Sequence, residues 1–134
     1  LDFSTDTMYY INCGIPALLV YTRAYNNVIE VQGEGHILGF VKDVAPYIKV
    51  KKVKLSEGDI VMIVTDGIID TKSLRGDIFG KTRTQNALME NSGYPAEKMA
   101  KFTYDALVEF TSKELENDIT MLVMKYLGNQ AAQA

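Results

Sequence analysis

The stretch that decides the fold is residues 59–70, DIVMIVTDGIID, in which an apolar run leads through one threonine into an acid and a glycine. Residues 60–64 are apolar at every position, which is typical of a strand covered on both faces of its sheet. A buried segment that ends on a carboxylate needs an explanation, because removing a charge from water is costly. Asp66 is therefore a candidate functional residue at the end of a central strand.

The same pattern occurs in reverse at residues 117–123, NDITMLV, where an acid precedes an apolar run. If the two apolar runs are neighbouring antiparallel strands, Asp66 and Asp118 meet at one edge of the sheet. Two adjacent carboxylates repel each other unless a cation lies between them. Hard oxygen ligands of this kind suit Mg²⁺ or Mn²⁺. The alternative is structural: Asp66 caps the turn after its strand, and Asp118 begins a strand from a loop.

Further elements follow from periodicity and turn residues on either side of the central stretch. Asn26 and Asn27 form a turn dipeptide that predicts a hairpin. Strands are expected at 8–12, 17–22, 28–32, 47–55 and 119–126. The strand at 47–55 is expected to have a bulge at Lys51-Lys52. Helices are expected at 84–91 and 95–111. Apolar residues at helical spacing in the last helix predict its core face: Met99, Phe102, Ala106, Leu107 and Phe110. Strands in front and helices behind predict an α+β fold.

Composition limits the possible classes of protein. The 134 residues suit one domain, and the net charge of −3 argues against nucleic-acid binding. The apolar runs are too short to cross a bilayer, so we expect no membrane contact from this segment. Cys13 is the single cysteine, which predicts a reducing, cytoplasmic location. We interpret Cys13 as a small buried residue. We interpret His36 as a surface residue of a glycine-rich loop. The chain begins Leu-Asp-Phe-Ser, without methionine, and we expect it to be a piece of a longer polypeptide.

Five stretches occur together in a familiar order: NCGIPALLVY at 12–21, ILGF at 37–40, LSEGDIVMIVTDGIID at 55–70, IFG at 78–80 followed by Arg83, and NDITMLVMK at 117–125. Together they resemble the metal-dependent serine/threonine phosphatases of the protein phosphatase 2C type, the PPM family, in its bacterial SpoIIE-like branch. The resemblance covers about residues 8–127. It implies that residues 1–127 are the C-terminal portion of such a phosphatase domain, and we expect residues 128–134 to be a flexible tail.

The resemblance implies an antiparallel β-sandwich flanked by helices, with two Mn²⁺ or Mg²⁺ ions at one end in the complete domain. A metal-activated water then hydrolyses phosphoserine or phosphothreonine without a covalent enzyme intermediate. By the same resemblance Asp66 is a direct metal ligand, and Thr65 and Gly67 shape the turn that presents it. Thr120 would support the second acidic segment by hydrogen bonding.

Three departures from the family pattern bear on activity. The family places its ligand at the position of Asn117, so either the Asn117 amide or the neighbouring Asp118 would bind the metal here. Ile15 stands where the family has a histidine, and Cys13 where it has an alanine. The family's first strands, two helices and a Gly-Asp segment that bridges the metals have no counterpart, so we expect this segment alone to be inactive. Exposed sheet edges would then favour a homodimer or ordering by further chain.

The resemblance implies that the parent protein is a cytoplasmic protein-serine/threonine phosphatase in signal transduction. Its substrate would be a phosphoprotein such as an anti-sigma-factor antagonist in a partner-switching pathway, and an upstream sensor or receiver domain is expected. The alternative is a catalytically degenerate phosphatase-like domain that serves as a protein-binding regulatory module. A third interpretation, which sets the resemblance aside, is a β-rich scaffold domain without metal.

Overall fold

A computed structural model describes residues 1–31 and 37–129 of the chain. Strand β5 (Ile60–Val64) lies inside an antiparallel sheet. Within these ranges the sheet has the order β3-β2-β5-β6, with β2 at Ala17–Thr22, β3 at Asn27–Glu30 and β6 at Met121–Lys125. A second sheet pairs β1 (Thr7–Tyr10) with β4 (Lys51–Lys54). The helices are α1 (Asp66–Ile69), α2 (Gly80–Glu90) and α3 (Ala96–Thr111), and a 3₁₀ turn spans Ala45–Tyr47. The glycine-rich loop at 33–35 and His36 lie outside the described residues.

The register of the sheet confirms the predicted hairpin and the predicted strand neighbours. β2 and β3 are antiparallel, and Asn26 in their turn has the left-handed φ of 46° that asparagine tolerates. β5 pairs antiparallel with β6, so that Val64 at the end of β5 lies opposite Met121 at the start of β6. The end of one apolar run therefore adjoins the beginning of the other, which is the arrangement on which the candidate metal site depends.

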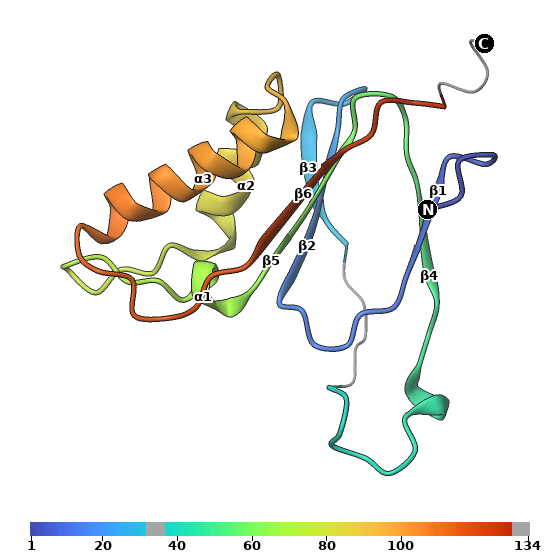
Figure 1. The fold of residues 1–134 in the computed structure, drawn as a ribbon, viewed down its shortest axis with the longest axis horizontal. Coiled ribbons are helices and arrows are strands. Elements are labelled where there is room, and N and C mark those ends of the chain that lie inside the picture. Colours follow the sequence, from blue (N-terminus) through green and yellow to red (C-terminus); the bar gives the residue numbers. More distant parts are fainter. Residues whose placement is uncertain (32–36, 130–134) are drawn as a thin grey trace.

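The central strand is apolar at every position because both of its faces are covered. Ile60, Met62 and Val64 belong to a core shared with the helices. Val61 and Ile63 face the opposite side, where they pack with side chains of β1 and β4. Figure 1 shows the resulting layers, with α2 and α3 on one side of the four-stranded sheet and the β1–β4 sheet on the other. The predicted α+β sandwich with flanking helices is confirmed.

Helix α3 buries a face that differs in part from the predicted one. Met99 and Leu107 are fully buried as expected, but Thr103 and Thr111 are buried beside them. The Thr103 hydroxyl donates to the carbonyl of Met99 at 2.9 Å, and the Thr111 hydroxyl donates to the carbonyl of Lys72 at 2.9 Å. Threonine can lie in this core because backbone carbonyls accept its hydrogen bond. None of the described helices has the length and apolar character required to span a membrane.

The strand predicted at 47–55 is shorter in the structure, and the bulge predicted at Lys51-Lys52 is wrong, because β4 pairs with β1 in continuous register. Residues 48–50 belong to no strand, and β4 covers only Lys51–Lys54. Pro46 lacks a backbone N–H and holds its φ near −65°, so the chain turns at Ala45–Tyr47 instead of extending. Within the described residues β4 pairs with β1 alone, and the Lys52 and Lys54 side chains are exposed, as expected for an edge strand.

The turn before β5 is fixed by a buried carboxylate, that of Asp59. Its side chain is 5 % exposed. One carboxylate oxygen accepts the backbone N–H of Arg23 at 2.9 Å, and the other accepts that of Ser56 at 2.8 Å. Asp59 therefore joins the loop after β2 to the turn that leads into β5. The sequence analysis assigned this residue no role.

The two ends of the described chain meet at Tyr126. Its ring stacks on that of Phe3 at 6.3 Å, and its hydroxyl donates a short hydrogen bond to the carboxylate of Asp6. The side-chain amide of Asn129 donates to the carbonyl of Phe3 at 2.9 Å. The last strand is thereby tied to the first residues of the chain.

We expect this contact to make stability fall at high pH. The hydrogen bond to Asp6 is the main cause that raises the pKa of Tyr126 to about 12, with burial adding to it. A tyrosine in the unfolded chain ionises near pH ~10. The stabilisation is therefore complete below pH ~10 and is lost as the pH rises toward about 12. Denaturant unfolding across this range should show a steeper loss in the wild type than in Tyr126→Phe, and parallel curves would contradict the prediction.

Candidate metal centre

The edge of the sheet at Thr65 and Thr120 is held by hydrogen bonds between the end of β5 and the start of β6. The backbone N–H of Thr65 donates to the carbonyl of Thr120 at 3.2 Å. The Thr65 hydroxyl donates to the same carbonyl at 3.3 Å and accepts the N–H of Thr120 at 3.1 Å. Thr65 therefore joins the two strands as well as leading into α1. Thr120 contributes through its backbone, whereas the prediction assigned it a supporting role without specifying the atoms.

Asp66 is the first residue of α1 and its side chain is exposed. Its backbone carbonyl accepts the N–H of Asp70 at 2.8 Å, while its carboxylate makes no hydrogen bond or ion pair within the described residues. The alternative in which Asp66 caps the turn is therefore not realised. A carboxylate that has no structural partner at the end of a buried strand is available for a ligand.

Gly67 explains how the two acidic segments approach each other. An ideal Cβ atom on Gly67 would lie 2.1 Å from the carbonyl oxygen of Asp118 and 3.5 Å from the Cα of Ile119. Only a residue without a side chain allows α1 to lie directly against this backbone. Gly67 is predicted to shape the turn that presents Asp66, and the structure adds its close contact with the backbone of Asp118. Asp66 and Asp118 are consequently carried by two segments in contact.

Gly67→Ala is expected to lower the free energy of unfolding by about 1–3 kcal/mol, because overpacking against backbone forces α1 and the 118–119 segment apart. Gly93→Ala is the matched control, since a Cβ there meets no atom within 4 Å. Its effect should stay within about 0.5 kcal/mol. Urea unfolding of both variants tests the expectation, and equal stability would show that the two segments do not depend on this contact.

The oxygen atoms at this edge are of the type that binds a hard cation, but they are too few to complete its coordination. Asp66, Asn117 and Asp118 are all exposed and offer carboxylate or amide oxygens. Mg²⁺ commonly takes one or two carboxylates and keeps several waters. Within residues 1–31 and 37–129, the structure contains no group of three or more His, Cys, Asp or Glu side chains that could hold a metal ion. The donors described at this edge would therefore fill only part of a coordination shell.

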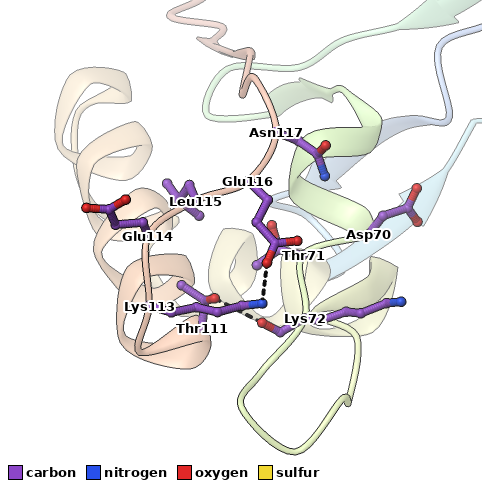
Figure 2. A pocket seen from close by; sticks show the side chains of 9 residues that line it. All are labelled: Asp70, Thr71, Lys72, Thr111, Lys113, Glu114, Leu115, Glu116 and Asn117. Atoms are coloured by element: carbon purple, nitrogen blue, oxygen red, sulfur yellow. Dashed lines mark hydrogen bonds and ion pairs between the residues drawn. The ribbon is translucent and has the colours of Figure 1, made fainter.

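A hollow of about 210 Å³ adjoins this edge. Figure 2 shows its lining side chains, which come from the segment after α1, from the last residue of α3 and from the segment between α3 and β6: Asp70, Thr71, Lys72, Thr111, Lys113, Glu114, Leu115, Glu116 and Asn117. Lys113 forms an ion pair with Glu116 at 2.6 Å, and this contact is the main cause that lowers the pKa of Glu116. Asn117 thus belongs both to the predicted metal ligands and to this hollow.

Asp70 is a further acid at this edge that the sequence analysis did not assign. It follows Asp66 by four residues at the end of α1, a spacing that places both on one side of a helix. The spacing within DGIID was the available signal. Thr71 fixes this end of α1, because its hydroxyl donates to the carbonyl of Gly67 at 2.6 Å.

Comparison with known proteins identifies relatives that match most of the chain. The family model for Stage II sporulation protein E (SpoIIE) matches residues 1–127. The phosphoserine phosphatase RsbU of Bacillus subtilis (strain 168) is 23% identical over 116 residues, which is 87% of this chain and 34% of RsbU. The chain therefore spans about a third of that relative.

Solved structures share the fold at low sequence identity. The PP2C domain of SiaA from Pseudomonas aeruginosa matches with a TM-score of 0.74 and 21% identity, over 90% of this chain and 46% of that one. A Mycobacterium tuberculosis protein with RsbU and RsbW domains gives 0.76 and 21%, over 96% and 35%. The Mn-presoaked phosphatase domain of SpoIIE from Bacillus subtilis gives 0.67 and 15%, over 94% and 53%. These solved structures share the fold of this chain and so confirm the predicted fold.

Proposed function

The chain belongs to the SpoIIE family, and on that premise we propose that its protein is a metal-dependent phosphatase of phosphoserine or phosphothreonine in proteins. The observation that carries the proposal is the contact of Gly67 with the backbone of Asp118. This contact puts the Asp-Gly turn after β5 against the acidic segment before β6. The name of RsbU, phosphoserine phosphatase, supports the class of reaction.

Each residue of the edge has a proposed task. The Asp66 carboxylate, together with the amide oxygen of Asn117 or the carboxylate of Asp118, would hold Mn²⁺ or Mg²⁺, and the complete domain is expected to hold two ions. When bound, such ions lower the pKa of water and neutralise charge on a phosphoryl group. Thr65 fixes the distance between the two strands through its bonds to Thr120. No side chain of this chain is proposed as a covalent nucleophile.

The proposed substrate is a small phosphorylated regulator, such as an anti-sigma-factor antagonist, in a cytoplasmic partner-switching pathway. The combination of RsbU and RsbW domains in the Mycobacterium tuberculosis relative supports a pathway of this kind. Such a pathway also supports the proposal of a sensor or receiver domain elsewhere in the protein. A homodimer remains a separate proposal, to be tested by sedimentation.

A second candidate is a binding module of the same fold without hydrolysis. Asn117 favours it, because an amide oxygen carries no charge and binds a divalent cation less strongly than a carboxylate does. The incomplete set of acids within the described part of the chain points the same way.

The deciding experiment is phosphate release from a phosphoserine peptide by the intact gene product that contains this chain, with Mn²⁺ or Mg²⁺ and with a chelator. Release that requires the metal supports the phosphatase. Asn117→Asp and Asp118→Asn identify the second ligand: the metal concentration for half-maximal rate should fall in the first variant if Asn117 binds the metal, and rise in the second if Asp118 does. Binding of the peptide by a folded protein that releases no phosphate would favour the binding module.

A further inference from the structure

A second hollow, of about 310 Å³, lies at the opposite end of the sheet from the candidate metal centre. It is lined by Tyr21, Arg23, Gly58, Ser92, Gly93 and Lys125. Tyr21 and Lys125 both lie opposite Ile60 at the first position of β5, whereas the metal edge follows Val64 at the last. Because a strand rises about 3.3 Å per residue, the length of β5 separates the two places by about 13 Å. The hollow is therefore distinct from the candidate metal centre.

The charged groups of this hollow all have the same sign. Among the described residues, Arg23 and Lys125 line it, and no carboxylate does. The Arg23 guanidinium makes no hydrogen bond or ion pair with the described residues. The carboxylate of Asp59 contacts this loop, but it lies buried and accepts the backbone N–H groups of Arg23 and Ser56 instead. A hollow that the described residues line with two cations and no carboxylate is complementary to an anion.

The two cations are held from different elements. Lys125, the last residue of β6, donates from its Nζ to the carbonyl of Ser92 at 2.8 Å and to that of Tyr94 at 3.1 Å. This anchors the ammonium group at the turn between α2 and α3. The three hydrogens of an ammonium group leave one for a further acceptor.

Gly58 lies beneath the Arg23 side chain. It has a φ of +91°, and an ideal Cβ on it would lie 2.5 Å from Cδ of Arg23 and 3.2 Å from Nη1. The Arg23 side chain therefore lies across Gly58, which leaves room for it by having no side chain.

We propose that this hollow binds a small molecule that carries a phosphate group. A guanidinium can bind two phosphate oxygens at once, and an ammonium adds a point charge. The hollow is of the size that accommodates small organic ligands in proteins, about 300–1,000 Å³, so a phosphate monoester fits it better than the free ion does.

The test is a titration of the ¹⁵N-labelled protein with inorganic phosphate, AMP and succinate, at constant ionic strength and with a chelator present. AMP is expected to shift the amide signals of Gly58 and Gly93 at lower concentration than phosphate, and succinate to shift them least. The chelator removes divalent cations, so the result does not depend on the metal centre or on phosphatase activity. Shifts confined to the metal edge, absence of shifts with all three compounds, or equal binding of succinate would overturn the proposal.

Arg23→Gln should weaken AMP binding at least about tenfold, because it removes the positive charge and the two-donor contact with the phosphate oxygens. Arg75→Gln is the matched control, since Arg75 is exposed in the loop after α1 and outside the hollow. Isothermal titration calorimetry measures both variants. Equal affinity of Arg23→Gln and the wild type would contradict the assignment, and the amide shifts of the wild type provide a readout that depends on no variant.

Discussion

Asp66→Asn is expected to reduce Mn²⁺-dependent phosphate release from a phosphoserine peptide at least about a hundredfold. A metal ion contributes several kcal/mol of transition-state stabilisation, and each 1.36 kcal/mol corresponds to about a factor of ten in rate. Asparagine keeps the size of the side chain but removes its charge. Because the Asp66 carboxylate bonds to no other described residue, the fold should be unaffected.

Asp105→Asn is the matched control, since Asp105 is an exposed acid of α3 whose partner is Lys101 at 2.5 Å. It should keep full activity. A second readout is the rise in melting temperature with Mn²⁺, because a ligand of the folded state alone stabilises it by about 2.7 kcal/mol at a hundred times its dissociation constant. That rise should be lost in Asp66→Asn. Full activity of Asp66→Asn would exclude this residue as a ligand, and an unchanged melting temperature of the wild type would favour the domain without metal.

Asp59→Ala is expected to lower the free energy of unfolding by about 2–4 kcal/mol. The carboxylate accepts the backbone N–H groups of Arg23 and Ser56. Hydrogen bonds to a charged group contribute about 1.5–3 kcal/mol each, and removal of the acceptor leaves the donors to find water in a part-buried turn. Urea unfolding measures the loss.

Two variants accompany this measurement. Asp59→Asn retains one acceptor oxygen and should lose about half as much stability. Asp77→Ala truncates an exposed aspartate of the loop after α1 and should change stability by no more than about 0.5 kcal/mol. If Asp59→Ala were no less stable than Asp77→Ala, the turn before β5 would not depend on the buried carboxylate.

The apolar run at 60–64 determined most of the architecture that the sequence could predict. A strand with no polar face must be covered on both sides, and the structure places a helical layer on one face and the β1–β4 sheet on the other. The Asn26-Asn27 turn predicted the hairpin because it acts between adjacent residues. Pro46 also acts locally: it lies in the turn at Ala45–Tyr47, and β4 is shorter than the predicted strand at 47–55.

Candidate ligands could be named from the sequence because a carboxylate at the end of a buried strand is unusual, since taking a charge out of water is costly. The prediction that Asp66 and Asp118 lie at one edge of the sheet rests on the local pattern and on the assumption that their strands are neighbours. The register of β5 and β6 confirms that assumption. Whether Asn117 or Asp118 binds the metal stays a prediction, since both are exposed on the same segment.

The sequence by itself determined the class of fold, the order of the main elements and the turn that carries Asp66, because apolar periodicity and turn chemistry act over a few residues. Only the tertiary structure decided why Gly67 must be glycine, what the buried Asp59 holds, and that Arg23 and Lys125 share a hollow without an acid. Each of these depends on contacts between residues more than thirty positions apart. Such contacts leave no periodic signal in a single sequence, because they are set by how the sheet and helices pack.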